Sequence, residues 1–130
     1  MNKFELTNKA NLLSGLVIGA ALEVHRTLGP GFLESVYEEA LCVELTLRRI
    51  DYQRQREIHL AYKDHPIGQA RLDLLVANQL IVELKSVESL LPIHQAQVIS
   101  YLKATSRNIG LLINFNVPVL KDGIKRIVLS

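Results

Sequence analysis

Cysteine and long apolar runs are both scarce in this sequence. The chain of 130 residues contains a single cysteine, Cys42, so it can form neither an intrachain disulfide nor a zinc site built from cysteines. The longest apolar run, 16–22, is far shorter than the roughly 20 residues that span a bilayer. Lys3, Glu5 and later polar residues interrupt the N-terminal segment, which excludes a typical signal peptide. These features predict a cytoplasmic protein that makes no membrane contact.

A strong net charge of either sign is also missing. Lys and Arg total 15 and Asp and Glu total 13, which gives a formal net charge of +2. This balance neither identifies nor excludes a nucleic-acid-binding protein. The composition, 48% hydrophobic and 22% charged, is that of a folded globular chain. The length predicts one domain over residues 1–130.

The spacing of apolar residues divides the chain into helical and strand-like segments. The expected elements are helices over 11–28 and 31–49, strands over 52–62, 67–76 and 80–87, a helix over 92–105, and strands over 109–115 and 124–129. The first three strands follow one another closely, which predicts an antiparallel meander. We therefore expect an α/β fold with a mixed central sheet flanked by helices.

The register of the second strand against the third decides which charged side chains meet. If residues 77–79 form a three-residue loop, Asp73 lies opposite Glu83 and the remaining aliphatic side chains share the other face. Those side chains are Leu72, Leu74, Val76, Leu80, Val82 and Leu84. A two-residue turn at 78–79 would instead pair Asp73 with Leu84 and bury charge among apolar groups. The three-residue loop is therefore predicted.

This register places two carboxylates side by side. The Cβ atoms of directly opposed residues lie about 4.5–5.5 Å apart, and Lys85 follows on the same face as Asp73 and Glu83. Carboxylates this close repel each other unless a cation or a proton lies between them. Mg²⁺ binds through one or two carboxylates and retains several waters. The hairpin thus predicts a divalent-metal site; the alternative is an ordinary hairpin with a charged solvent face.

The same residues resemble those of a known group of enzymes. Asp73, followed ten residues later by Glu83-Leu84-Lys85, is similar to the motif of the PD-(D/E)xK nuclease superfamily. The segment 31–37 resembles the signature of the GxxExxY proteins, a branch of that superfamily. The proline that precedes the superfamily's aspartate is absent, because Leu72 occupies that position. The resemblance implies an α-β-β-β-α-β core, here preceded by an additional N-terminal helix.

The resemblance also implies individual roles. Asp73, Glu83 and the Leu84 carbonyl are the expected ligands of Mg²⁺ or Mn²⁺, and Lys85 is the expected catalytic lysine. Glu34 is expected to complete the metal shell or to position water.

Four further residues are candidates for positioning the substrate. Gln97 and Tyr101 resemble a Q-x-x-x-Y element of recombination-type exonucleases in the superfamily, and His94 precedes them on the same helical face. Tyr37 follows Glu34 by three residues, so both could face the cleft. For both tyrosines, packing into the core is the alternative role.

These residues together predict a metal-dependent nuclease that hydrolyses phosphodiester bonds, with DNA favoured over RNA. One alternative is a nuclease-derived module that binds nucleic acid or assembles with a partner without turnover. Another is a structural α/β domain with a charged hairpin. Because the net charge is low, a homo-oligomer or a protein partner is expected to assist binding.

Overall fold

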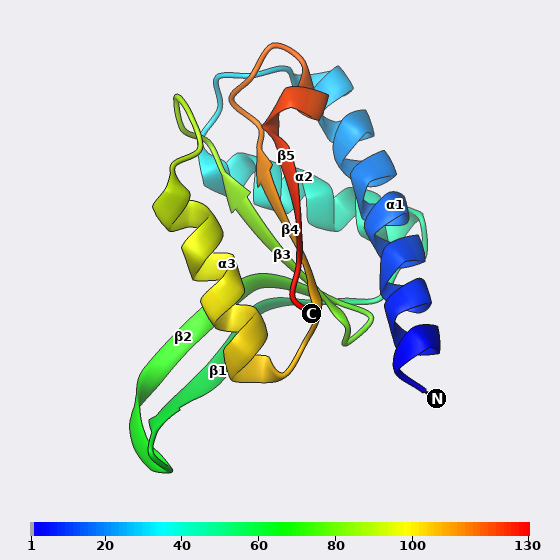
Figure 1. Ribbon diagram of the computed structural model, residues 1–130. Helices are drawn as coiled ribbons and strands as arrows, with labels where there is room; N and C mark the ends of the chain where they lie inside the picture. Colours follow the sequence, from blue (N-terminus) through cyan, green and yellow to red (C-terminus); the bar gives the residue numbers. More distant parts are fainter. Residues whose placement is uncertain (1) are drawn as a thin grey trace.

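Three helices and five strands follow one another in the predicted order (Figure 1). The computed structural model describes residues 2–130. Its elements are α1 (Lys3–Leu28), α2 (Glu34–Leu47), β1 (Tyr52–Tyr62), β2 (His65–Val76), β3 (Leu80–Lys85), α3 (Pro92–Thr105), β4 (Ile109–Asn114), the 3-10 turn η1 (Leu120–Gly123) and β5 (Ile124–Val128). The α/β class with a mixed sheet is confirmed.

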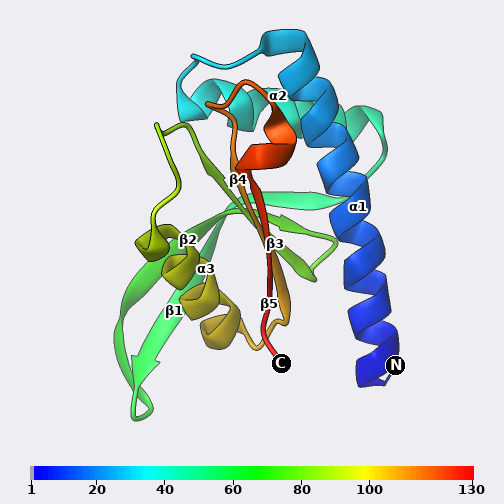
Figure 2. The same ribbon diagram turned by 45° about the horizontal axis from the view of Figure 1, so that its top comes forward.

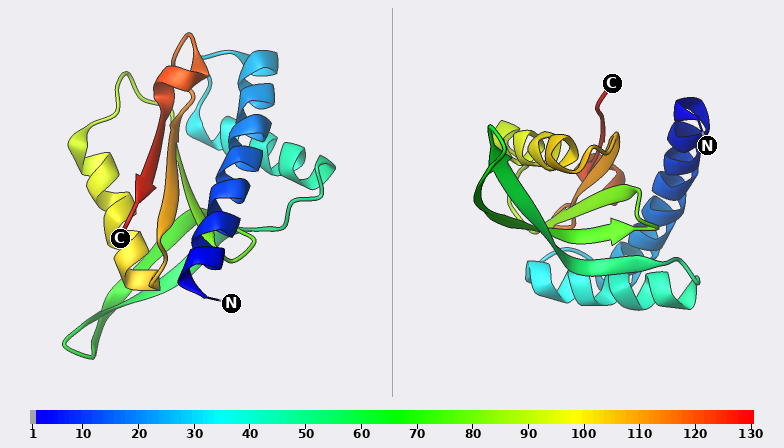
Figure 3. Two further views of the ribbon diagram at one scale, coloured as in Figure 1. Left: turned by 45° about the vertical axis from the view of Figure 1, so that its right-hand side comes forward. Right: turned by 90° about the horizontal axis from the view of Figure 1, so that it is seen from below.

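The five strands form one sheet in the order β1-β2-β3-β4-β5. Strands β3 and β4 run parallel because α3 connects them as a crossover, and every other neighbouring pair is antiparallel. Helices α1 and α2 cover one face of the sheet and α3 covers the other, as Figure 3 shows. Each face has its own cluster of buried apolar side chains. The acids of the candidate site lie on β2 and β3, between the layer formed by α1 and α2 and the layer formed by α3.

The first two helices begin at residues other than those predicted. Helix α1 begins at Lys3 rather than residue 11, because the Asn2 side chain accepts the N–H of Glu5 at 2.8 Å and caps the helix. Helix α2 begins at Glu34 rather than residue 31, since Gly31 has a φ of +104° that a helix cannot contain. Among residues 2–130, no helix is both long and apolar enough to cross a membrane.

The predicted register between β2 and β3 is confirmed at its closed end. Val76 pairs with Leu80 and Leu74 pairs with Val82 across the loop 77–79. Ala77 and Asn78 adopt left-handed conformations, with φ of +48° and +59°, and so close the loop without glycine. Asn tolerates this conformation better than most residues.

The expectation that six aliphatic side chains share one face is wrong for Leu72. Leu74 and Val76 pack in the cluster beneath α1 and α2, but Leu72 packs beneath α3 with Leu75. Residues two apart share a face in a regular strand, so the backbone of β2 rotates between Leu72 and Leu74. The rotation is centred on Asp73, which has no partner in the backbone ladder to β1 or β3.

The outer half of the β1–β2 hairpin projects away from the body of the molecule (Figures 1 and 2). Residues 61–69 are all exposed. Lys63 and Asp64, both left-handed, form the two-residue turn at the tip. Nothing in the described part of the chain covers this segment, which we call the arm (residues 61–69).

Candidate active site

Two acidic side chains link β2 to β3 at the point where the backbone ladder between these strands ends. The last ladder pair is Leu74–Val82. One residue farther on, Glu83 Oε2 accepts the N–H of Asp73 at 2.7 Å, and Asp73 Oδ2 accepts the N–H of Leu84 at 2.8 Å. The carboxylates therefore take the place of strand-to-strand carbonyls, and β2 and β3 diverge beyond them (Figure 1).

Burial makes this pair of acids electrostatically costly. Glu83 is only 4% exposed, and burial, followed by the negative charge of Asp73, raises its pKa to about 8. Burial also raises the pKa of the half-buried Asp73, although the hydrogen bond from the Leu84 N–H acts in the opposite direction. Burial and mutual repulsion thus favour protonation of the pair unless positive charge is brought to it.

Lys85 supplies part of that positive charge from a distance. It is half-buried and follows Glu83 by two residues on β3. Its ammonium lowers the pKa of both Asp73 and Glu83, yet it forms no direct ion pair with any carboxylate in the described residues. The ammonium therefore stabilises negative charge on the two acids without forming an ion pair with either of them.

Helix α2 brings two more acids toward the hairpin. Glu34 is the first residue of this helix, and its partial burial together with the charge of Asp73 raises its pKa. Glu38, one turn later, is buried, and its charge raises the pKa of Asp73 in turn. Glu38 was not among the predicted site residues; its spacing of four residues from Glu34 on a helix was the available signal.

The donor atoms at the hairpin fit a hard divalent cation. Asp73 and Glu83 each use one carboxylate oxygen on a backbone N–H, which leaves Asp73 Oδ1 and Glu83 Oε1 as further oxygen donors. Across residues 2–130, however, no three side chains among His, Cys, Asp and Glu converge closely enough to hold one ion together. The structure thus assembles a two-carboxylate site and does not bring Glu34 into direct contact with it.

Helix α3 covers the other face of the sheet, and the charges of the same acids act on one of its residues. Partial burial raises the pKa of Tyr101, and the charges of Glu83 and Asp73 raise it further, whereas a hydrogen bond with Gln97 lowers it. The charges of the acids therefore act on Tyr101, and Gln97 is its hydrogen-bond partner. His94 instead accepts the N–H of Leu91 on Nδ1 at 3.0 Å and caps the start of the helix.

Tyr37 lies in the core. Its side chain is fully buried and stacks on Phe115, with ring centroids 4.6 Å apart. Its hydroxyl donates to the carbonyl of Gly29 at 2.5 Å and accepts the N–H of Phe32 at 3.2 Å. This arrangement favours the packing alternative for Tyr37, whose ring stacks on the residue that directly follows β4.

Two polar residues of β1, Arg54 and Gln55, complete the surroundings of Asp73. Arg54 Nε donates to Glu38 Oε2 at 2.8 Å, and Gln55 Nε2 donates to Glu38 Oε1 at 2.7 Å. Gln55 Nε2 also lies 3.5 Å from Asp73 Oδ1. No sequence pattern indicated Gln55, because its contact depends on a backbone conformation that is irregular for a strand.

Comparison with known proteins gives one match. A family model described as PD-(D/E)XK nuclease superfamily matches residues 11–127. No curated protein and no solved structure matches the chain. The match covers nearly the whole fold, including the acidic pair, Lys85 and α3. This protein is accordingly a member of the PD-(D/E)XK nuclease superfamily.

Proposed function

We propose that this protein is a divalent-metal-dependent nuclease whose ion is held by Asp73 and Glu83. The observation that carries the proposal is the reciprocal pair of hydrogen bonds between these acids and the opposite strand. It fixes the buried Glu83 carboxylate beside the half-buried Asp73 carboxylate. Mg²⁺ or Mn²⁺ would remove their mutual repulsion.

The residues of the site would have separate roles in hydrolysis. Asp73, Glu83 and the Leu84 carbonyl would hold the ion, which when bound would supply Lewis-acid polarisation of a phosphate oxygen and a more acidic water. Glu34 would orient water from the start of α2. The Lys85 ammonium stabilises negative charge that develops on the phosphate in the transition state.

Helix α3 provides polar groups for the substrate. The charges of Asp73 and Glu83 raise the pKa of Tyr101, and Gln97, one helical turn earlier, is its hydrogen-bond partner. We propose that they contact the phosphate backbone. His94, which already caps the helix through Nδ1, would act through its other ring nitrogen, Nε2.

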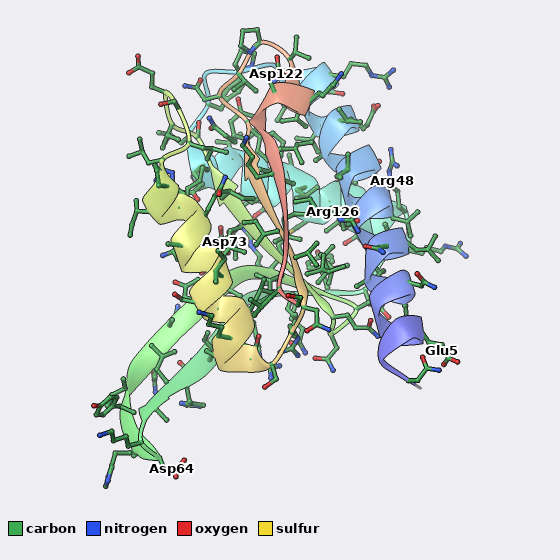
Figure 4. All side chains as sticks on the ribbon, viewed as in Figure 1. Glu5, Arg48, Asp64, Asp73, Asp122 and Arg126 are labelled. Atoms are coloured by element: carbon green, nitrogen blue, oxygen red, sulfur yellow. The ribbon has the colours of Figure 1, made fainter. Side chains whose placement is uncertain are left out.

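The arm provides a second contact surface, and DNA is the favoured substrate. Lys63 lies at its tip, and Arg71 follows it on β2 just before the acidic pair; both residues are exposed. Figure 4 shows the tip at Asp64, well separated from Asp73. A two-stranded ribbon of this kind fits the major groove of duplex DNA. The arm would thus hold DNA at a distance from the bond that is cut.

We further propose that the chain belongs to the GxxExxY branch. Gly31 has the positive φ that favours glycine, and Tyr37 holds the backbone of Gly29 and Phe32 through its hydroxyl. These contacts fix the loop that precedes Glu34. Gly31 and Tyr37 therefore fix the position of Glu34, the third residue of the signature, near Asp73.

One observation favours a second candidate, a module that binds nucleic acid without turnover. The described residues bring only two carboxylates together at the hairpin, rather than three. Such a module, assisted by a second copy or a protein partner, would bind DNA through the arm and α3.

Cleavage of linear duplex and single-stranded DNA, with RNA in parallel, separates the two candidates. The nuclease requires cutting that depends on Mn²⁺ or Mg²⁺ and is abolished by Asp73→Ala. The matched control is Asp64→Ala, which removes an exposed carboxylate at the tip of the arm. Metal-independent retention of DNA by the wild-type protein, without cutting, would support the module instead.

A further inference from the structure

Gln55 adopts a backbone conformation that is unusual for a strand residue. Its φ is +52°, in the left-handed region that side chains other than glycine rarely occupy. Its neighbours Arg54 and Arg56 pair normally with Leu74 and Leu72 of β2. Gln55 itself, which would face Asp73, has no partner in this ladder. The irregularity therefore lies directly opposite Asp73.

The contacts of Arg54 and Gln55 explain what this conformation achieves. Consecutive side chains of a regular strand point to opposite faces, so only one of two neighbours can reach a given group. Here both reach the same carboxylate: Arg54 binds Glu38 Oε2 and Gln55 binds Glu38 Oε1. The left-handed turn at Gln55 makes this double contact possible.

The double contact orients the Gln55 amide. Glu38 is buried and also held by Arg54, so it is a fixed acceptor for one of the two amide hydrogens. The second hydrogen is left for Asp73 Oδ1, at a donor–acceptor distance of 3.5 Å. Asp73 Oδ2 accepts the Leu84 N–H, so the two contacts approach the carboxylate from different strands.

We propose that Gln55 is a positioning residue that orients the Asp73 carboxylate for divalent-ion binding. A glutamine amide donates to two carboxylates without adding charge, and it thereby separates Glu38 from Asp73. Glutamate at this position would bring a third negative charge to them. The strained backbone at Gln55 persists because the arrangement needs it, which is typical of functional sites. The inference rests on the proposed metal site and adds a residue to it.

Mn²⁺ titration calorimetry on five proteins tests the inference: the wild type, Gln55→Ala, Gln55→Gly, Asp73→Asn and Gln69→Ala. Gln69 is an exposed glutamine of β2 and serves as the matched control. Loss of a residue that orients a metal ligand weakens metal affinity about 10-fold or more. We expect that loss in both Gln55 variants and wild-type affinity in Gln69→Ala. Unchanged affinity in both Gln55 variants, with binding lost in Asp73→Asn, would overturn the positioning role and leave the metal site intact.

Thermal unfolding separates the effect of Gln55 on metal binding from its effect on the stability of the fold. Glycine accepts a positive φ without the Cβ penalty, so Gln55→Gly should melt at a higher temperature than Gln55→Ala while binding Mn²⁺ equally poorly. A lower melting temperature for Gln55→Gly would contradict the strained conformation.

A metal-independent measurement tests the role of Gln55 even if the proposed metal-dependent function is wrong. If the wild type takes up no Mn²⁺, a double-mutant cycle of Gln55→Ala and Asp73→Ala in metal-free unfolding decides the inference. Coupling that changes the unfolding equilibrium constant at least about twofold supports a direct Gln55–Asp73 interaction. Additive effects would overturn it.

Discussion

Glu83 accepts the backbone N–H of Asp73 at 2.7 Å, so an acidic side chain stands where a carbonyl would join two antiparallel strands. Asp73 returns the contact by accepting the N–H of Leu84. A backbone carbonyl carries no net charge, whereas these two groups together carry up to two negative charges in a buried place. The hydrogen bonds fix the position of the pair, and its charge makes the pair a site for a cation or a proton.

The free energy of unfolding of the metal-free protein should fall as the pH rises from about 4.5 to about 8. Folding raises the pKa of Glu83 from 4.5 to about 8, so in this interval the folded protein keeps a proton that the unfolded chain releases. The contribution of this proton to the free energy of unfolding is fully present below pH 4.5 and is lost as the pH rises through 8. The slope from one such group is at most about 1.4 kcal/mol per pH unit.

Urea unfolding in EDTA at several pH values measures this slope. We expect Glu83→Gln to flatten it, and Glu88→Gln, at an exposed position, to leave it unchanged. A slope that is equally steep in Glu83→Gln would show that Glu83 is not the group that holds the proton.

Lys85→Met should abolish most of the cleavage and leave DNA binding nearly intact. The ammonium lowers the pKa of both Asp73 and Glu83, so it lies close enough to stabilise charge at the reacting phosphate. Loss of one such group lowers kcat about 10²–10³-fold. Single-turnover cleavage at saturating enzyme is the measurement, with Lys103→Met on the exposed part of α3 as control. Equal rates for Lys85→Met and the wild type would remove Lys85 from the catalytic machinery.

Removing the cations of the β1–β2 hairpin should weaken DNA binding. Lys63, at the tip of the arm, and Arg71, two residues before Asp73, are both exposed, so Lys63→Ala/Arg71→Ala should reduce affinity. If each cation contacts one phosphate, the slope of log K against log salt becomes shallower by about 1.8. Fluorescence anisotropy over a range of salt concentrations measures it, and an unchanged slope would exclude the arm from the DNA interface.

Gly110→Ala should destabilise the protein through α3. A Cβ on Gly110 would lie 2.7 Å from Val98 Cγ1 and 3.4 Å from the Ile81 carbonyl oxygen, so α3 must move away from β4. Overpacking of this kind costs about 1–3 kcal/mol. Chemical denaturation measures the loss, and Gly15→Ala, where a Cβ meets nothing within 4 Å, is the control. Equal stability of the two variants would show that α3 tolerates a wider separation from the sheet.

Much of the hairpin could be predicted from the sequence because one physical condition fixes its register. Only the three-residue loop keeps Leu74 and Val82 on the buried face while Asp73 and Glu83 avoid it, and the structure has this pairing. Pro92 likewise marks the observed start of α3. Periodicity works in the hairpin because Leu74, Val76, Leu80, Val82 and Leu84 pack in the one cluster beneath α1 and α2.

The rest depended on contacts that no local pattern reveals. Strand alternation predicts that Leu72 shares a face with Leu74. Its side chain lies on the opposite face because β2 rotates at Asp73. The role of Gln55 follows from its positive φ and from Glu38, which lies 17 residues earlier in the chain. Likewise, the deep burial of Tyr37 comes from its stacking on Phe115, a residue of the last third of the sequence. Tertiary packing decides these features.

Calorimetric titration of Mn²⁺, with and without a DNA oligonucleotide, tests the central claim most directly. The account predicts uptake of the ion by the folded wild-type protein, loss of this uptake in Asp73→Asn and Glu83→Gln, and normal uptake in Asp64→Asn. Equal uptake by the wild type and both site variants, or no uptake by the folded wild type even with DNA present, would contradict it.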